Sequence, residues 1–88
     1  MMKNLNISVL QINYDKNHDV LYLYIGTPKE SYGEEDDDGF IIRKSFETDE
    51  ITGFTLLDFN KNIDKIELFF NSIDYNININ EIKNKIIA

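Results

Sequence analysis

The sequence predicts an α+β domain: a four-stranded antiparallel β-sheet, arranged as a meander, followed by one or two short helices packed on one face. Three observations predict this fold. Apolar residues alternate or form short blocks as far as about residue 59, and short polar segments separate the blocks. From residue 62 the apolar residues recur with helical spacing. The chain has 88 residues, so we expect one domain over residues 1–88, with the sheet over about 5–59 and helices over about 62–87.

Four segments have the composition of strands: residues 5–14, 20–25, 40–46 and 51–59. The first segment changes the parity of its apolar residues at Val9–Leu10, which predicts a bulge there. The second reads VLYLYI and is apolar on both parities, as in a central strand covered on both faces. In the last segment, alternation places Phe54 and Phe59 on opposite faces. Short polar connections between consecutive strands favour antiparallel neighbours.

The C-terminal part predicts helices. Apolar residues with 3.6-residue spacing predict an amphipathic helix over residues 62–73. Residues 75–80 alternate between apolar residues and asparagines, as in a short strand or an extended connector. Residues 81–87 predict a second helix, which is too short to be stable unless it docks. Three asparagines are candidate N-caps: Asn60 or Asn62 for the first helix and Asn80 for the second.

The composition excludes several classes of function. The chain has no cysteine, so it has no disulfide, no thiolate zinc site and no cysteine nucleophile. His18 is its one histidine, which excludes a site with several histidine ligands. Sixteen acidic residues against nine basic ones, a net charge of −7, argue against direct binding to nucleic acid. No phosphate-binding glycine loop is present. We therefore predict a protein that is not an enzyme, with no catalytic residues, no metal and no cofactor.

The termini and the hydropathy pattern bear on the compartment. The first residues contain no apolar segment typical of a signal peptide, and no stretch is as long and apolar as a membrane span. We therefore predict a cytoplasmic protein without membrane contact. The chain contains 14 Ile, 11 Asn and 8 Lys, whose codons are AT-rich, and this indicates a bacterial or phage genome.

The negative charge is concentrated in residues 26–39, which we expect to form a loop. The longest run of acids consists of Glu34, Glu35, Asp36, Asp37 and Asp38. Such a run is typical of a solvated loop that protects a sheet edge, and it also suits a docking surface for a basic partner. Calcium binding is a third interpretation, but a helix–loop–helix calcium pattern that starts at Glu34 fails because its twelfth position is Ser45.

Three segments resemble, in order, the conserved segments of one bacterial family: YD-x-x-x-D-VLYL over residues 14–23, DGFII over 38–42 and ITGFTLLD over 51–58. The chain is identified from them as similar to the DUF2283 family, a small bacterial domain of unknown function, over about residues 11–60. The resemblance implies a small four-stranded antiparallel sheet and implies no activity. This chain departs from the family pattern at two places. It has Arg43 and Lys44 where the family often has acids, and it has Thr55 where the family commonly has a Glu in the fourth strand. Genes of this type sometimes lie beside small toxin-like genes, which suggests an antitoxin-type role.

Four functional hypotheses follow. The first is a binding or regulatory module that works by protein–protein contact, as an antitoxin-like partner of a small basic protein, with residues 34–38 as the contact. The alternative is an acidic phage-type inhibitor that mimics nucleic acid in the groove of a larger enzyme, such as a CRISPR effector. A third is a small hydrolase that uses Asp15, His18 and Asp19. A fourth is a homodimer joined through a sheet edge, with residues 75–80 as the pairing strand.

Overall fold

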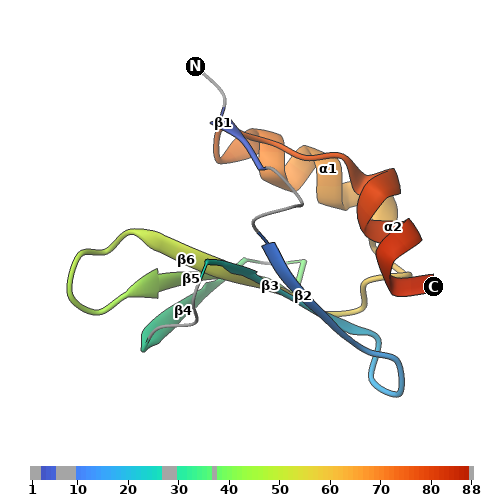
Figure 1. Cartoon of the computed structure of the whole chain (residues 1–88), viewed down its shortest axis with the longest axis horizontal. Coiled ribbons are helices and arrows are strands. Elements are labelled where there is room, and N and C mark those ends of the chain that lie inside the picture. Colours follow the sequence, from blue (N-terminus) through green and yellow to red (C-terminus); the bar gives the residue numbers. More distant parts are fainter. Residues whose placement is uncertain (1–2, 6–9, 27–29, 37, 88) are drawn as a thin grey trace.

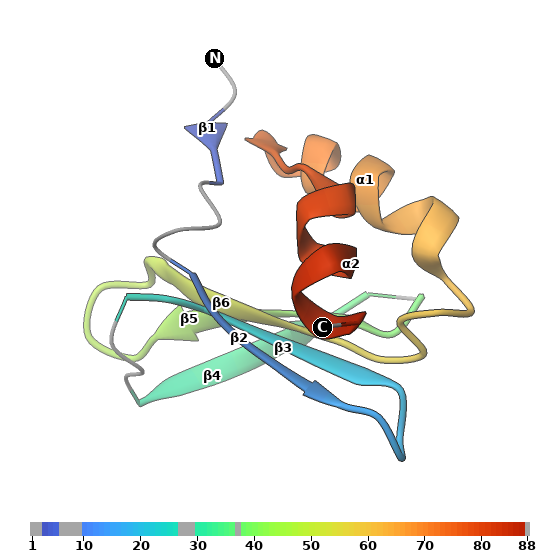
Figure 2. The same cartoon turned by 45° about the vertical axis from the view of Figure 1, so that its right-hand side comes forward.

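The computed structural model describes residues 3–5, 10–26, 30–36 and 38–87, and it confirms the α+β class. These residues form one main antiparallel sheet with two helices on one side of it (Figures 1 and 2). The main sheet consists of β2 (Leu10–Asp15), β3 (Val20–Ile25), β4 (Ser31–Glu35), β5 (Phe40–Ser45) and β6 (Ile51–Leu56). The other elements are α1 (Ile63–Ser72), α2 (Ile79–Ile87) and two short strands, β1 (Lys3–Asn4) and β7 (Tyr75–Asn76). Neither helix is long and apolar enough to span a membrane, among the residues described.

The order of strands in the sheet differs from the prediction. Over the described residues the sheet has five strands in the order β2-β3-β6-β5-β4, so the predicted four-stranded meander is wrong. Strand β6 is the last strand of the main sheet in sequence but lies at its centre, because Thr55 pairs with Tyr22 on one side and with Ile41 on the other. The additional strand, β4, lies within the predicted loop 26–39. Its sequence, SYGEE, contains no buried residue, because an edge strand is held by backbone pairing and needs no apolar side chains.

The central strand β6 is shorter than predicted. It ends at Leu56 rather than at residue 59, because the chain turns at Asp58, which adopts a left-handed φ of 51°. This turn returns Phe59 to the core that already contains Phe54, so the prediction of opposite faces is wrong. A Cβ atom at Gly53 would collide with the carbonyl oxygen of Leu23, so the close approach of β6 to β3 requires glycine there.

Both helices pack on the same face of the sheet, as predicted (Figure 2). No described element covers the other face, so the prediction that the strand over residues 20–25 is covered on both faces is wrong among the described residues. The ring of Phe54, on β6, lies at the centre of the core and contacts the rings of Phe69, Phe70 and Tyr75 at centroid distances of 6.3, 4.7 and 5.9 Å. The largest fully buried side chains are Leu21, Leu23, Phe40, Phe54, Leu56, Phe59, Ile66, Phe70 and Ile82. Burial of each such side chain stabilises the fold by roughly 1.5–3 kcal/mol, so this layer of contacts holds the helices on the sheet.

The N-termini of the helices differ from the prediction in detail. Helix α1 begins directly after Asn62, but the side chain of Asn62 makes no capping hydrogen bond. Helix α2 begins two residues earlier than predicted, and its cap is Asn78 rather than Asn80. The Oδ1 atom of Asn78 accepts hydrogen bonds from the backbone N–H groups of Asn80 (3.1 Å) and Glu81 (3.3 Å). Helix α2 docks through Ile82, which is 1% exposed.

Strands β1 and β7 pair in parallel, so the N-terminal residues Lys3 and Asn4 lie beside the segment that connects the two helices. Of the predicted strand 5–14, β2 accounts for the residues from Leu10 onward, whereas residues 6–9, and with them the bulge expected at Val9–Leu10, lie outside the described residues. The predicted strand 75–80 is limited to β7, because Ile77 is buried and the residues from 79 onward are helical. The edge proposed for a homodimer is thus partly used within the chain, by β1.

Candidate functional site

Strands β4 and β5 and the turns that flank them form the outer edge of the sheet. We call residues 30–50 the acidic hairpin. Of the five predicted contact residues, Glu34 and Glu35 end β4, Asp36 and Asp38 lie in the turn to β5, and Asp37 is outside the described residues. The segment predicted as a loop is therefore largely a strand and a turn, whose position is set by the pairing of β4 with β5.

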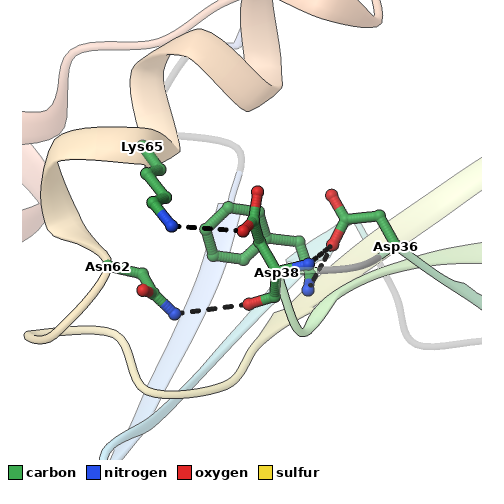
Figure 3. A network of polar contacts seen from close by, with 5 residues as sticks. Asp36, Asp38, Asn62 and Lys65 are labelled. Atoms are coloured by element: carbon green, nitrogen blue, oxygen red, sulfur yellow. Dashed lines mark hydrogen bonds and ion pairs between the residues drawn. The ribbon is translucent and has the colours of Figure 1, made fainter.

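The turn between β4 and β5 is organised by one of the predicted residues (Figure 3). The Oδ1 atom of Asp36 accepts hydrogen bonds from the backbone N–H groups of Asp38 and Phe40, both at 2.9 Å. The backbone N–H of Asp36 donates to the carbonyl oxygen of Phe40 at 3.0 Å, and Gly39 has a φ of 83° that closes the turn. The carboxylate of Asp36 therefore has a structural role.

Two further carboxylates have lysine partners within the chain. The Nζ atom of Lys44 lies 3.1 Å from Glu34, and that of Lys65, on α1, lies 3.2 Å from Asp38 (Figure 3). Asn62 also donates from its side chain to the carbonyl oxygen of Asp38 at 3.3 Å. Exposed ion pairs of this kind contribute only about 0–1 kcal/mol, so a cation from a partner can replace the lysines at little cost.

A second group of acids lies at the opposite end of the same strands. Its members are Glu30, Glu47, Asp49 and Glu50. Between them, the hydroxyl of Tyr32 donates to Asp49 at 2.8 Å, and this hydrogen bond to a carboxylate raises the pKa of Tyr32. The ring of Phe46 lies 5.5 Å from the ring of Tyr32, centroid to centroid, and is 66% exposed. Asp49 of the second acidic group therefore lies beside an aromatic pair in which Phe46 is exposed and Tyr32 is half-buried.

Together the two groups account for the net charge of the chain. Residues 30–50 contain nine acids against Arg43 and Lys44, a net charge of −7, and the rest of the chain contains seven acids and seven bases. Reasoning from sequence missed the second group because it treated residues 47–50 as a connection. The pairing of Ser31 with Ser45 brings residues 47–50 to the beginning of β4, next to Glu30. The available signal was the uncompensated charge of residues 47–50, one strand length after the first run.

The three residues of the hydrolase hypothesis do not form one cluster. The Nδ1 atom of His18 lies 2.8 Å from Asp15 on an exposed turn, and the hydrogen bond from His18 lowers the pKa of Asp15. Asp19 instead accepts a hydrogen bond from the hydroxyl of Tyr14 at 2.6 Å and another from the backbone N–H of Asn60. We call these contacts the Asp19 latch, because they join the β2–β3 turn to the segment before α1.

A polar groove of about 540 Å³ lies where β1 and β7 meet the helices. Asparagines line it together with Glu67 and Glu81, and the described residues of its lining include no serine, cysteine or histidine. These described residues therefore offer hydrogen-bonding groups but no nucleophile. Among the described residues, no three acidic or histidine side chains are placed to hold a metal ion.

One comparison with known proteins gives a match. A family model described as "Protein of unknown function (DUF2283)" matches residues 11–62, which include β2 from its second residue, β3 to β6 and the whole acidic hairpin. No curated protein and no solved structure matches the chain.

Proposed function

Because the chain belongs to the DUF2283 family, whose description assigns no function, we propose from its own geometry that it is a non-enzymatic binding module that contacts a basic protein through the acidic hairpin. The observation that carries the proposal is the location of the net charge. All of the excess negative charge lies on one edge hairpin, while the rest of the chain is neutral in sum. A field concentrated in this way accelerates the approach of a cationic partner and orients it.

The hairpin offers charge at two places rather than one. The acids of the β4–β5 turn and those around Glu47 lie at opposite ends of β4, whose five residues span about 17 Å. The aromatic pair Tyr32–Phe46 lies beside the second group. Exposed aromatic side chains commonly act as anchors in protein interfaces. We therefore expect a partner that has two groups of Lys or Arg with an apolar pocket near one of them.

The role that we favour is that of an antitoxin-like regulator, which binds a small basic protein in the cytoplasm. The alternative, an inhibitor that mimics nucleic acid, would use the same acids against the basic groove of a larger enzyme. The extended arrangement of the two acidic groups along one edge favours this alternative as the second candidate. The two roles differ in one observable, since the mimic displaces nucleic acid from its target.

The first experiment measures binding of a fluorescent octalysine peptide to the wild type and to a variant with Glu30, Glu35, Glu47 and Glu50 changed to Gln. No hydrogen bond or ion pair of these four side chains is found among the described residues, so the fold should persist. A matched control removes four acids elsewhere: Asp64→Asn, Glu67→Gln, Asp74→Asn and Glu81→Gln. We expect the hairpin variant to bind at least about ten-fold more weakly at low salt and the control to change by less than about three-fold. Equal weakening in both variants would contradict the proposal.

The second experiment identifies the partner. The tagged wild type, the hairpin variant and the control variant are purified from cells of the native host, and the co-purified proteins are compared. We expect a basic protein that the hairpin variant fails to retain and the control retains. Recovery of every partner in equal amounts by all three proteins would rule out the acidic hairpin. Displacement of duplex DNA from the recovered partner would favour the mimic over the antitoxin-like role.

A further inference from the structure

The face of the main sheet opposite the helices is not covered by any described element (Figures 1 and 2). The pairing register places six residues of the three middle strands there. We call them the open face: Tyr22, Tyr24, Ile41, Arg43, Gly53 and Thr55. None of them belongs to the core cluster or to the apolar residues packed against it. The open face therefore has aromatic and apolar side chains with no partner layer among the described residues.

A buried hydroxyl at the centre of the open face lacks a partner. Thr55 is 5% exposed, and its Oγ1 atom makes no hydrogen bond among the described residues. Its cross-strand neighbours, Tyr22 and Ile41, lie on the same side of the sheet and leave it facing away from the helices. Buried polar groups in native proteins are nearly always hydrogen-bonded. The described residues supply no partner for this hydroxyl, and a chain packed on this face can supply one.

The charge of the open face distinguishes it from the neighbouring edge. Among its six residues Arg43 is the single charged one, and it is positive. Its Nη1 atom lies 3.6 Å from where a Cβ atom of Gly33 would be, so the guanidinium extends over a glycine that has no side chain to cover it. No ion pair of Arg43 occurs within the described part of the chain. Glu35, which pairs with Ile41, is an acid at the border of the same face, on β4. The centre of the face is thus a surface on which two copies of an acidic chain can meet without placing acids against acids.

We propose that a second copy of this chain packs on the open face, in a two-fold dimer whose axis lies between the two sheets and runs parallel to β6. Tyr24 and Arg43 are the two cross-strand neighbours of Gly53, on opposite sides of it. A two-fold rotation about this axis exchanges these sides and so places Arg43 of each copy against Tyr24 of the other, which is a cation–π pair. The same rotation places Ile41 against Tyr22 and brings the two Thr55 hydroxyls together at the axis.

The size of the face determines the strength of the contact. Five strands at about 4.8 Å and five residues at about 3.4 Å give roughly 400 Å² of sheet per copy. This is about half of the 800 Å² that each partner contributes to a standard interface, so the dimer is reversible and depends on concentration. This arrangement buries Ile41 and Arg43 of the acidic hairpin, but the acids in the turns at the two ends of the hairpin lie beyond the border of the sheet and stay accessible. The dimer therefore does not rest on the function proposed above.

The test is sedimentation velocity on the full chain from about 1 to about 500 µM. The wild type is expected to shift from monomer toward dimer across this range. Arg43→Glu and Tyr24→Arg are each expected to weaken association at least about ten-fold, and Arg43→Ser is a milder change in the same direction. The double variant with Arg43→Glu and Tyr24→Arg is expected to restore association, because the introduced glutamate of each copy then faces the introduced arginine of the other, so that opposite charges replace the cation–π pair.

The control changes an exposed apolar residue on the other side of the molecule. Leu68, on α1, is 70% exposed, and Leu68→Glu is expected to leave the association constant unchanged. A monomer at every concentration would overturn the proposal. So would a dimer that the single substitutions do not weaken, or one that the double variant does not restore. Loss of association with Leu68→Glu would move the contact to the helical face and would also overturn it.

Discussion

The acidic hairpin and the helix-covered part of the sheet differ in what their side chains do. Strands β3 and β6 contribute Leu21, Leu23, Phe54 and Leu56, each of them at most 1% exposed, to the core beneath the helices. The acidic hairpin contributes one fully buried side chain, Phe40, from within the described residues. It contains the entire excess negative charge instead.

This difference shows how a small domain can be strongly charged and stable. Like charges repel, and a net charge of −7 spread over the core elements would oppose their packing. Here the charge is confined to a hairpin whose packing is mainly backbone pairing at a sheet edge. Charged edge strands also resist pairing with other chains. The comparison predicts that stability depends on the covered part and binding depends on the hairpin.

The largest difference in the loss of unfolding free energy is expected between alanine substitutions at two phenylalanines, Phe54 and Phe46. Phe54→Ala removes a ring that contacts Phe69, Phe70 and Tyr75, and we expect it to lower the free energy of unfolding by about 3–5 kcal/mol. Phe46→Ala, in the acidic hairpin, should change it by less than about 0.5 kcal/mol because Phe46 is 66% exposed. Urea unfolding followed by circular dichroism measures both. Similar losses for the two variants would contradict the division between core and hairpin.

The next effect compares two aspartates that organise turns. Asp19→Ala breaks the latch to Tyr14 and Asn60, and we expect a loss of about 1–3 kcal/mol. Asp36→Ala removes local bonds in the β4–β5 turn and should cost about 1 kcal/mol. Asp19→Asn serves as a control, because asparagine tolerates the φ of 54° at this position. A larger loss from Asp36→Ala would reverse the expected order.

The same latch predicts a dependence on alkaline pH. The hydrogen bond to Asp19 raises the pKa of Tyr14 above its ordinary value of 10.0. A raised pKa in the folded state means that the stabilisation is fully present below the unfolded pKa and is lost as pH rises through the folded pKa. Ultraviolet titration of the tyrosines should therefore show one group whose pKa falls on Asp19→Ala. No change in any tyrosine pKa would argue against the latch.

A smaller effect concerns the hairpin charge itself. The variant with Glu30, Glu35, Glu47 and Glu50 changed to Gln should be as stable as the wild type or more stable by about 0.5 kcal/mol at low salt, because repulsion between exposed acids is relieved. This gain should disappear in high salt, where exposed charges are screened. Thermal unfolding at two ionic strengths measures it. Destabilisation by the four substitutions would show that the acids support the fold.

The smallest effect belongs to the exposed pair of His18 and Asp15. The hydrogen bond from His18 lowers the pKa of Asp15 from its ordinary value of 3.8, so the small stabilisation is present above the unfolded pKa and is lost as pH falls through the folded pKa. In His18→Ala the pKa of Asp15 should rise toward 3.8. NMR titration of the carboxyl carbon measures the change. An unchanged pKa would show that the pair does not form in solution.

Some elements could be predicted from local pattern alone. The run VLYLYI predicted β3 because β-branched and aromatic residues favour strands, and the helical spacing from Ile63 predicted α1 to within a residue at each end. Strand β4 could not be predicted in this way. Its residues, SYGEE, show no apolar alternation, since periodicity reports which side chains are buried and an edge strand buries few.

The acidic site was predicted only in part, because local sequence pattern does not show which distant residues become neighbours. The run from Glu34 to Asp38 was visible in the sequence, but its internal partners were not, because Lys65 approaches Asp38 only after α1 packs on the sheet. The second acidic group needed the pairing of β4 with β5 to bring Glu30 and Glu47 to one end. Long-range neighbours depend on strand register, which composition does not encode.

The sequence by itself determined the α+β class and the net charge of −7, because hydrophobic periodicity and charge are properties of residues and their local spacing. The tertiary structure decided the rest. It placed β6 between β3 and β5, where Gly53 permits close approach, and it made one edge of the sheet acidic while leaving the opposite face uncovered. The physical reason is that strands are joined by backbone hydrogen bonds, which are nearly independent of side chains, so their order is selected only by the packing of the whole.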